Sequence, residues 1–283
     1  MKTILIPTDF SENAGDALAY AIDLIGREKA LVHIVNVSDP AILAADESIS
    51  NDAEKLLQLK ESRQSLEALE VFSKARFGTG SESHIRIVTH LVGGAIAPMI
   101  RSLAKELDVD LIIMGTQGVQ HDFVEKRLGT VSTTIFKNAP CPVILVPRAY
   151  VFKPISNILF ATNLNHSDPY ALWKATELIK PHIGVVRCLH VVEKPEDKHD
   201  RHLEEFAKYM IEHSPSIQTI FTIEVNEQVE AAITEYADTY SVELIIMHKS
   251  KHPLWERLLK SGHTKNMASQ IKVPLLVMNE EKE

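Results

Sequence analysis

The feature that most constrains the fold of this chain is an internal repeat. The first copy, residues 111–147, begins LIIMGTQG, passes through the run GTVS and ends in VILVP. The second copy begins at residue 244 as LIIMHKSK and ends in LLVM at residue 278. Both copies keep the apolar frame, but the second has lost the glycines that follow its first apolar run. We therefore expect two domains of the same fold, of which only the first keeps a glycine-bearing loop for a ligand.

Each half alternates short apolar segments with segments of helical periodicity, which is typical of α/β domains. The segments predicted as strands are 3–7, 31–37, 85–91, 111–114 and 143–146, then 157–161, 185–192, 219–225, 244–247 and 275–278. Near-continuous apolar runs such as LIIM and VILV favour parallel strands that are buried on both faces. The predicted fold class is α/β, with two Rossmann-like domains at 1–148 and 154–283. Each is expected to be a five-stranded parallel sheet of order 3-2-1-4-5 flanked by helices.

Capping residues mark the ends of the predicted helices. Ser11 is expected to cap the helix after the first strand, and Gly26 to end it. In the second half Ser167 or Asp168 can cap the matching helix, with Pro169 at its first position. Other helices are predicted near 52–77, 94–107, 201–214 and 227–240. The helix near 52–77 has apolar residues that are expected to pack on its own sheet, with a partner surface as the alternative: Leu56, Leu59, Leu66, Leu69 and Phe72.

Composition excludes several classes of protein. The chain has 283 residues, a formal net charge of −8 and a pI near 5.9, so it lacks the positive charge that attracts nucleic acid or anionic lipid. Cys141 and Cys188 fall in different copies, which favours buried free thiols in a reducing compartment. The first residues run directly into an apolar strand, and no apolar run approaches the roughly 20 residues of a membrane span. We expect a cytoplasmic protein with no nucleic-acid or membrane partner.

The loop after the fourth strand carries the strongest functional signal. Its glycines have the spacing Gly115-x2-Gly118-x10-Gly129. Glycine lets the backbone reach positive φ and lets amides approach an anion closely. The run Thr-Val-Ser at 130–132 follows at the start of the last helix, where free amides and the helix dipole favour phosphate. The loop and helix start together indicate an anion site.

The loop after the first strand is expected to lie beside it. In the predicted order the first and fourth strands are neighbours, at the topological switch point where open α/β sheets bind ligands. Asp9 follows the first strand and could accept hydrogen bonds from a ribose diol there. No GxxxxGK[ST] sequence is present, and no GxGxxG follows the first strand. The pattern favours a nucleotide site built without either motif.

At these residues the chain resembles the universal stress protein family in its tandem form. The resemblance covers both halves and rests on the opening ILIPTDFS, the strand VHIVNV, and the stretch from LIIMGTQG through GTVS to PVILVP. ATP-binding members of that family show G-x2-G-x9-G-[ST] after the fourth strand. Gly115, Gly118, Gly129 and Thr130 match this pattern, with a middle spacer of ten residues in place of nine.

The resemblance implies an adenine nucleotide alpha hydrolase-like fold and a nucleotide-dependent stress-response regulator that acts through an unidentified protein partner. It places Asp9 at the ribose, Val37 at the adenine, and Thr130 and Ser132 at the phosphates of ATP, with Mg²⁺ held through the phosphates. The expected ATP contacts are Pro7, Thr8, Asp9, Val37, Met114, Gly115, Gly118, Gly129, Thr130, Val131 and Ser132. No residue is assigned a catalytic or metal-binding role.

The second half departs from the family pattern at matching positions. Asn163 replaces Asp9, while His248 and Lys251 replace the two loop glycines. The sequence Ser261-Gly262 stands where glycine and then Ser or Thr belong, and only Thr264 keeps its place. Side chains at the former glycines would crowd an anion. We therefore expect ATP in the first domain only, with the second as a structural or regulatory domain.

Two other functions are open on the sequence alone. The first is a slow ATPase or another nucleotide-using enzyme of the same superfamily, for which His121 and Asp122 in the extended loop are the supporting feature. The second is a nucleotide-free interaction module, in which the ten-residue spacer closes the pocket. The regulator is the favoured interpretation because no paired carboxylates and no HIGH or SGGxDS sequence accompany the loop.

Histidines in the second half raise a weaker alternative. His248, His252 and His263 surround the degenerate loop, and a zinc site there is less expected than a surface role in a loop broken by a proline. A second group, with Asp197, His199, Asp200 and His202, is expected to form a solvated helix start.

The terminal strands bear on assembly. Residues 143–146 and 275–278 are apolar and are predicted to lie at sheet edges, where an unpaired apolar strand promotes aggregation. Pairing one with the other would protect both. We expect an internal pseudo-dimer of the two domains, or a homodimer.

Overall fold

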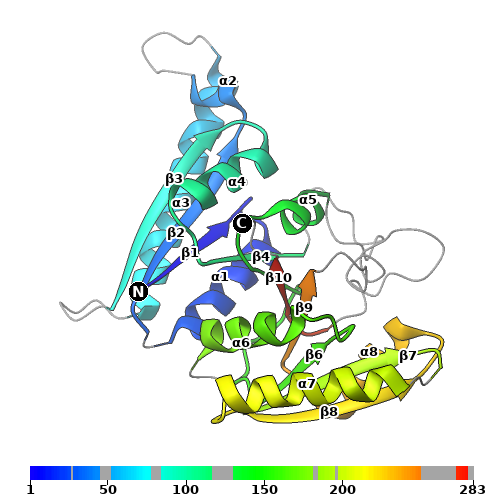
Figure 1. Ribbon diagram of the computed structural model, residues 1–283. Coiled ribbons are helices and arrows are strands. Elements are labelled where there is room, and N and C mark those ends of the chain that lie inside the picture. The colour runs from blue at the N-terminus through cyan, green and yellow to red at the C-terminus, as the bar shows by residue number, and fades with distance from the viewer. Residues whose placement is uncertain are drawn as a thin grey trace. The chain divides into compact units, whose positions relative to one another are not determined.

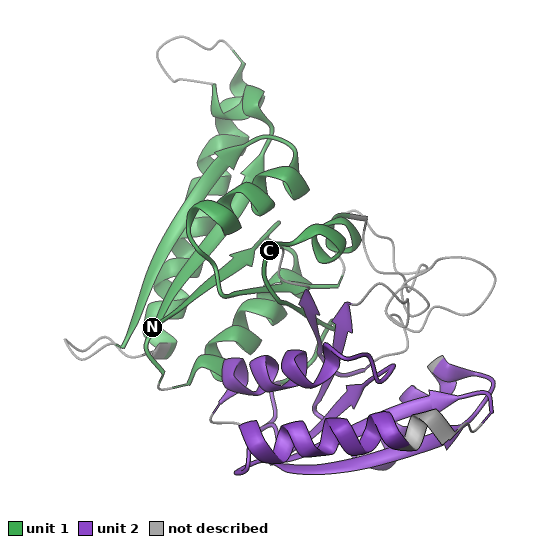
Figure 2. Ribbon diagram, viewed as in Figure 1, with its two compact units in different colours: residues 1–122, 129–151 green, residues 123–128, 152–283 purple. Residues whose placement is uncertain are grey.

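The computed structural model of the chain contains two compact units (Figure 2). The described residues are 1–26, 28–44, 52–77, 84–116, 130–180, 184–194, 197–249 and 272–279. Among these, the first unit extends to residue 151 and the second begins at residue 152. Each unit has its own parallel strands and its own helices, as the repeat predicts.

Among the described residues, the first unit is a parallel sheet of five strands with helices on both faces (Figure 1). Its elements are β1 (Lys2–Pro7), α1 (Glu12–Ile25), β2 (Ala30–Ser38), α2 (Pro40–Leu43), α3 (Ala53–Phe77), β3 (Ile85–Gly93), α4 (Ile96–Glu106), β4 (Leu111–Gly115), α5 (Thr130–Asn138) and β5 (Val143–Val146). The strand order is β3-β2-β1-β4-β5, and the pairings are parallel. Helix α1 packs with α3, and α4 packs with α5. The predicted order is confirmed for this unit.

The second unit repeats the arrangement. Its described elements are β6 (Asn157–Ala161), α6 (Asp168–Ile179), β7 (Val185–Val192), α7 (Asp197–His213), β8 (Gln218–Val225), α8 (Val229–Thr239), β9 (Leu244–Lys249) and β10 (Leu275–Asn279). The strands run β8-β7-β6-β9-β10, which is the same order as in the first unit. The helix predicted between the last two strands falls outside the described residues.

The cores are built from the apolar strands, as expected for strands covered on both faces. Every residue of β4 and β5 is buried. On the facing side of α1, Ala17 and Ala21 are both fully buried, and their small side chains let the helix approach the sheet closely. Cys141 and Cys188 are buried free thiols, as predicted, and burial raises the pKa of the Cys141 thiol to about 12.

An acidic side chain fastens the amino ends of the central strands in each unit. In the first, Asp110 accepts a hydrogen bond from the backbone amide of Thr3 at 2.7 Å. In the second, Glu243 accepts from the amides of Ser156 at 3.1 Å and Asn157 at 2.7 Å. Because both acids directly precede the fourth strand of their unit, the repeat has preserved this connection as well as the apolar core.

The helix ends agree in part with the capping signals. Ser11 caps α1 by accepting from the amide of Ala14, and Gly26 ends the helix at a φ of 54°, as predicted. In the second unit Ser167 occupies the N-cap position but makes no side-chain cap. Helix α6 begins at Asp168, so the proline is second rather than first, because Asp168 is already helical.

Two other local features differ from what the sequence indicated. The short helix α2 was not predicted, because four residues are too few to show a helical period. Its local signal was the capping residue Asp39 followed by Pro40 at the first helical position. Strand β9 was expected to end at residue 247, with His248 in a loop. The strand continues through Lys249 because both added residues pair with β10, at Met278 and Asn279.

Helix α3 has 25 residues, and it packs on its own sheet, as expected. Leu59 and Leu66 are buried, as expected, but Phe72, which was expected to pack with them, is exposed, as are Leu57 and Val71. Charged residues recur along its length. Within the described ranges, no helix combines the length and apolarity needed to cross a membrane.

Candidate functional site

The candidate site lies at the carboxyl ends of β1 and β4, which are adjacent and parallel in the first unit. The crossovers diverge here, since β2 lies on one side of β1 and β4 on the other. Open α/β sheets bind ligands at this point. Two loops therefore define the site: the one that leaves β1 at Thr8 and the one that leaves β4 at Thr116.

The loop after β1 is held rigidly by its own hydrogen bonds. The amide of Thr8 donates to the carbonyl of Val35 at 2.8 Å, and the side-chain amide of Asn36 donates to the carbonyl of Thr8 at 2.9 Å. The hydroxyl of Thr8 then accepts from the amide of Phe10 at 3.0 Å. This turn puts Phe10 at a φ of 62°, an uncommon conformation for an aromatic residue. Hydrogen bonds to β2 and within the turn therefore fix this loop in place without a ligand.

Asp9 projects from this rigid turn. The residue is exposed, and its Oδ1 accepts a hydrogen bond from the amide of Ser11 at 3.1 Å. An ionised carboxylate offers about four lone-pair sites on its two oxygens. Its chemistry suits a donor pair such as a ribose diol, as the sequence predicts.

The loop after β4 begins at a glycine that has no room for a side chain. A Cβ on Gly115 would lie 2.7 Å from the side chain of Asn13 and 2.8 Å from its backbone oxygen. The side-chain amide of Asn13 in turn donates to the carbonyl of Val146 at 3.2 Å, and the hydroxyl of Thr116 donates to Asn13 Oδ1 at 3.4 Å. Gly115 is thus required by the packing of α1 on β4, a reason that its place in a glycine-rich loop did not indicate.

Helix α5 follows the loop after β4, and its first turn lies against the end of that strand. The hydroxyl of Ser132, which is buried, donates to the carbonyl of Gly115 at 3.1 Å, so its proton fixes the helix start to the end of β4. Val131 is 37% exposed, which leaves the first turn of the helix accessible. The amides of a first turn lack partners within the helix and favour anions.

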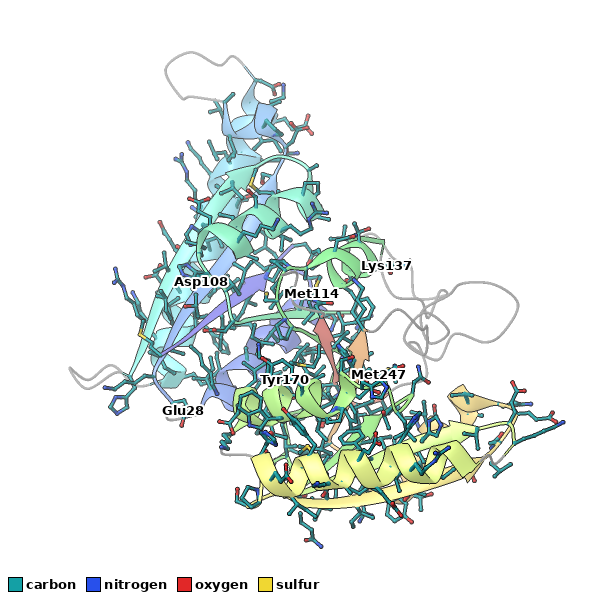
Figure 3. All side chains as sticks on the ribbon, in the orientation of Figure 1. Glu28, Asp108, Met114, Lys137, Tyr170 and Met247 are labelled. Carbon is teal, nitrogen blue, oxygen red and sulfur yellow. The ribbon has the colours of Figure 1, made fainter. Side chains whose placement is uncertain are left out.

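The other predicted contacts have different environments. Met114, which Figure 3 labels, is buried near the end of β4, and Pro7 is buried at the end of β1. Val37 is half-buried near the end of β2. Thr130 is the first residue of α5. Gly118, Gly129 and the ten-residue spacer, including His121 and Asp122, lie outside the described residues.

The second unit repeats the turn at its own first strand. The amide of Thr162 donates to the carbonyl of Leu189 at 3.0 Å, and its hydroxyl accepts from the amide of Leu164 at 2.8 Å. Leu164 has a φ of 56°. His190 Nδ1 lies 2.8 Å from the Thr162 carbonyl, and since a carbonyl only accepts, the ring carries its proton there. His190 thus does for Thr162 what Asn36 does for Thr8.

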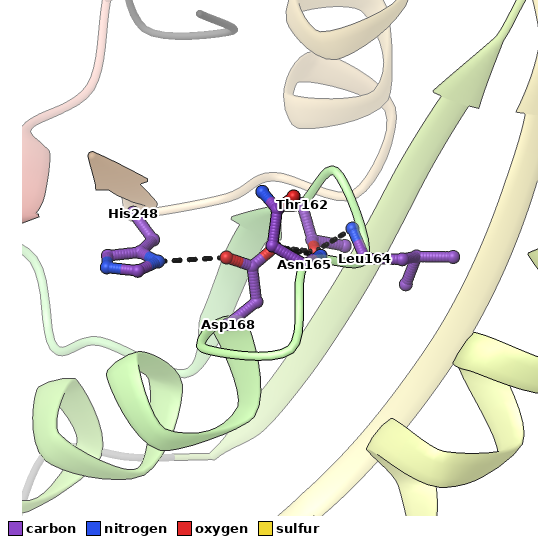
Figure 4. A network of polar contacts seen from close by, with 5 residues as sticks. All are labelled: Thr162, Leu164, Asn165, Asp168 and His248. Atoms are coloured by element: carbon purple, nitrogen blue, oxygen red, sulfur yellow. Dashed lines mark hydrogen bonds and ion pairs between the residues drawn. The ribbon is translucent and has the colours of Figure 1, made fainter. Parts of the chain in front are cut away.

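Beyond that turn the second unit differs, because a buried carboxylate occupies the switch point (Figure 4). Asp168 accepts from the hydroxyl of Thr162 at 2.5 Å, from the amide of Asn165 at 3.1 Å and from His248 Nδ1 at 2.9 Å. The side chains of Asp168 and His248 are only 2% and 6% exposed. The histidine predicted to lie on the surface or in a loop is instead part of a closed polar network.

The network explains how a carboxylate is tolerated in this core. A buried charge is costly unless donors surround it. Here three donors do so, two from the turn after β6 and one from β9. The effect of Asp168 extends to Cys188, because burial raises the pKa of that thiol and the nearby negative charge raises it further. His252 and His263, the other members of the suggested zinc group, lie outside the described residues.

Sequence reasoning missed the residues that hold these loops. Asn36 is a polar residue inside the apolar strand ALVHIVNVS, and Asn13 is a polar residue on the buried face of α1. A polar residue at a buried position needs a hydrogen-bond partner. The occurrence of these two asparagines within apolar patterns could therefore have indicated that they hold a neighbouring loop. The link between Asp168 and His248 joins residues 80 apart and left no such local trace.

Comparison with known proteins agrees with the fold. A family model described as the Universal stress protein family matches residues 1–147 and again 154–279. A universal stress protein of Methanocaldococcus jannaschii is 33% identical over 150 residues, which cover 52% of this chain and 82% of that protein. The crystal structure of a universal stress protein from Archaeoglobus fulgidus superposes with a TM-score of 0.71, covers 98% of both chains and is 19% identical, a likeness of fold.

Proposed function

Because the chain belongs to the universal stress protein family, we propose that its first unit binds ATP and its second unit does not. The bound nucleotide, with Mg²⁺ at its phosphates, would control the contact of the chain with a protein partner in a stress response. The Mg²⁺ ion needs no dedicated cage of side chains, because it is commonly held by phosphate oxygens and water.

The observation that carries this proposal is the contrast between the two switch points. In the first unit Asp9 is exposed on a rigid turn, and the first turn of α5 is accessible. In the second unit Asn163 takes the place of Asp9, and Asp168 with His248 fills the space at the end of β9. A ligand there would have to displace a buried carboxylate from three donors, which is energetically unfavourable.

Each part of the first site has a defined task in this proposal. Asp9 accepts the ribose hydroxyls, while the amides at Val131 and Ser132 face the phosphates and the helix dipole adds to the attraction. Val37, near the end of β2, borders the adenine. The hydroxyl of Ser132 keeps the helix start against Gly115 and so positions these amides.

Calorimetric titration of the purified full chain with ATP and Mg²⁺ tests the proposal. We expect about one ATP per chain. Replacing Asp9→Ala removes charge-assisted hydrogen bonds worth about 1.5–3 kcal/mol, so the dissociation constant should rise roughly tenfold or more. Asn163→Ala, at the matching position of the second unit, is the control and should leave binding unchanged.

The opposite results are equally clear. Two equivalent sites per chain, or a loss of affinity in Asn163→Ala, would place nucleotide in the second unit. Retained affinity in a chain that carries both Asp9→Ala and Gly118→Val would remove the site from these loops altogether. Incubation with ATP followed by chromatography of the products distinguishes a regulator from a slow ATPase, and the regulator should leave ATP intact.

Pairing of the terminal strands into an internal pseudo-dimer, and a homodimer as its alternative, stay predictions from the sequence. So does the cytoplasmic location. Size-exclusion chromatography with light scattering separates a 31.7 kDa chain from a dimer of twice that mass.

A further inference from the structure

A groove on the first unit, drawn green in Figure 2, lies between helices α1 and α3. Its volume is about 520 Å³, which is within the range of binding clefts. None of the expected nucleotide contacts lines it. Its wall includes three apolar and three charged side chains: Leu18, Leu69, Phe72, Glu12, Asp16 and Arg148.

The groove is open where α1 has a glycine. Gly15 is an exposed residue of this helix, and a helical glycine lowers stability relative to alanine because it gives the unfolded chain more freedom. Among the described residues nothing lies within 4 Å of the place that a Cβ on Gly15 would take, so packing inside the unit does not require glycine here. The space beside Gly15 instead lets the backbone of another molecule approach α1 closely.

Helix α3 supplies an aromatic side chain to the same groove. Phe72 is 47% exposed, Leu69 is half-buried, and Leu18 is buried beneath them. A single exposed apolar side chain is ordinary and needs no explanation. Phe72 differs because it borders the same open space as Gly15, and aromatic side chains in such grooves are the usual anchors of protein interfaces.

The second unit shows that the fold does not require this groove. Counted from the turn that both units share, Pro169 stands at the position of Gly15. The cavity that Pro169 lines, between the start of α6 and α7, measures about 180 Å³. The same arrangement of helices therefore forms with a much smaller space at this place.

The charges that border the groove favour a positive partner. Arg148 pairs with Glu12 at 2.5 Å, whereas Asp16 accepts a hydrogen bond from an uncharged donor, the backbone amide of Ala149, at 2.7 Å. The lining thus has two acids and one base, on a chain whose formal net charge is −8. Its complement is an apolar surface flanked by lysine or arginine.

We propose that the groove between α1 and α3 binds an amphipathic helix of a partner protein, whose apolar side chains contact Leu69 and Phe72 and whose lysine or arginine pairs with Asp16. A helix laid in an apolar groove is a recurring mode of peptide recognition. The groove supplies the surface for the protein contact in the proposed function, and in that respect it rests on that function. Binding of the helix itself requires no nucleotide.

A synthetic peptide tests the proposal. The probe is an amphipathic helix with leucine on one face and lysine on the other, and its fluorescence anisotropy is followed as the nucleotide-free full chain is added. We expect saturable binding of one peptide per chain. A peptide with the same leucine face and glutamate in place of lysine should bind at least roughly tenfold more weakly, because like charges then face each other.

Two variants alter the apolar surface of the groove. Gly15→Leu fills the open space with a good helix former and should prevent binding, whereas Ala53→Leu, at the exposed start of α3 and outside the described lining, should not. Phe72→Ala should weaken binding at least roughly fivefold, the loss that distinguishes an anchor residue in an interface. Its control is Val71→Ala, because this neighbour is 68% exposed but does not belong to the described lining. Urea unfolding shows whether each variant is folded.

Another pair of variants tests the charge. Asp16→Asn keeps an oxygen that can accept from the Ala149 amide but removes the negative charge. The lysine peptide should bind about two- to fivefold more weakly, as expected for loss of a partly exposed ion pair. Glu28→Gln, at an exposed acid of the same unit outside the described lining, removes the same charge and should leave affinity unchanged.

Three results would overturn the proposal. The first is peptide affinity that is absent, or that survives in both Gly15→Leu and Phe72→Ala. The second is an equal loss in Asp16→Asn and Glu28→Gln, because the peptide would then respond only to net charge. The third is a dimer of the full chain that Gly15→Leu dissociates, which would place a second copy in the groove. Since no nucleotide is present, none of these results depends on whether the first unit binds ATP.

Discussion

The two units treat the carboxyl ends of their first and fourth strands in opposite ways. In the first, the fourth strand ends in Gly115, and the amide of Asn13 occupies the space beside it. In the second, His248 stands at the position of that glycine, one residue before the end of β9, and reaches across to a buried carboxylate on α6. One strand order therefore supports both an accessible switch point and a closed one, and strand order by itself does not identify a binding domain.

The features shared by both units are those of the fold. Thr8 and Thr162 make the same turn, their carbonyls each accept from a side chain on the neighbouring strand, and the residue two positions on has positive φ in both. Backbone strain at a loop can indicate function. Because Leu164 has the strained conformation in the closed unit as well, the strain at Phe10 belongs to the turn and carries no information about a ligand.

The differences are coordinated rather than scattered. Where the first unit has Asn13 and Ala14 at the start of α1, the register of the repeat places Ser167 and Asp168 at the start of α6. In the first unit Gly115 leaves room for the side chain of Asn13. In the second unit His248 has the smaller Ser167 at the position of Asn13, and it binds the acid that follows, Asp168. Loss of glycine in the second copy was therefore accompanied by changes that stabilise the new side chain.

Removal of the acid should have the largest effect. Asp168→Ala leaves the Thr162 hydroxyl and His248 Nδ1 buried without their acceptor, and breaking a buried pair of this kind costs about 3–5 kcal/mol. Urea unfolding of the full chain, followed by a probe of the second unit, measures the change. Glu177→Ala, which removes an exposed carboxylate of the same helix that pairs with Lys180, should cost under about 1 kcal/mol.

An effect of similar size in both variants would show that the Asp168 network contributes no more than a surface ion pair. The comparison between the two switch points would then lose its energetic basis, although the difference in geometry would remain.

A methyl group at the open switch point should have the next largest effect. Gly115→Ala puts a Cβ within 2.8 Å of Asn13, including its backbone oxygen, so α1 has to move away from β4. Overpacking of this kind costs about 1–3 kcal/mol. Gly15→Ala on the same helix is the matched control, because its Cβ meets nothing within 4 Å. That change should stabilise the protein by about 0.5–1 kcal/mol.

The two alanine variants should therefore shift the midpoint of urea unfolding in opposite directions. If Gly115→Ala left the free energy of unfolding unchanged, the space that Gly115 leaves for Asn13 would have no consequence for stability.

The parts of the fold that follow from local pattern were predictable. Apolar runs such as LIIM identify strands because burial on both faces demands them, and right-handed crossovers then leave few orders for five parallel strands. Capping by Ser11 and termination at Gly26 depend on residues within one turn of each other. Each of these features needs only nearby residues or a general rule of topology.

The parts that depend on distant residues were not predictable. Whether residue 248 lies in a strand depends on pairing with Met278, thirty positions later. Whether Asp168 is a cap or an acceptor depends on His248. Likewise, Gly115 could be recognised as necessary, but its reason, contact with Asn13, depends on how α1 crosses β4. A pattern in one sequence gives the type of each residue, but it does not show which distant residues come into contact in the fold.

The two units also differ at one matching position of their second strands, where β2 has His33 and β7 has Arg187. In the first unit His33 Nδ1 and His90 Nε2 are 2.8 Å apart, and His33 Nε2 has no partner among the described residues. In the second, Arg187 lies over the ring of Tyr240 at 4.1 Å, and no carboxylate in the described part of the chain pairs with it. One unit has a titratable pair at this place and the other a fixed charge.

The smallest predicted effect is a difference in the response to acid. Burial lowers the pKa of both histidines; His90 and Arg86 lower that of His33 further, and Glu106 partly opposes the change at His90. Because the unfolded chain keeps the ordinary pKa of 6.5, it binds more protons than the folded chain below that pH. The stability of the first unit should therefore fall as the pH drops below about 6.5, until both folded-state values are passed.

Replacement of His90→Thr, the residue type that Thr222 supplies at the matching place, removes one member of the pair and should reduce this loss. The measurement is the free energy of unfolding of the first unit between about pH 7.5 and pH 5, the range in which ordinary histidines titrate. His213→Thr, at an exposed position of α7, is the control and should keep the full slope. The loss of stability is expected because two rings that share one hydrogen cannot both accept a proton without separating. If the unfolding free energy of His90→Thr fell with pH as steeply as that of the unmodified chain, protonation of the histidine pair would have no effect on stability, and the prediction would be wrong.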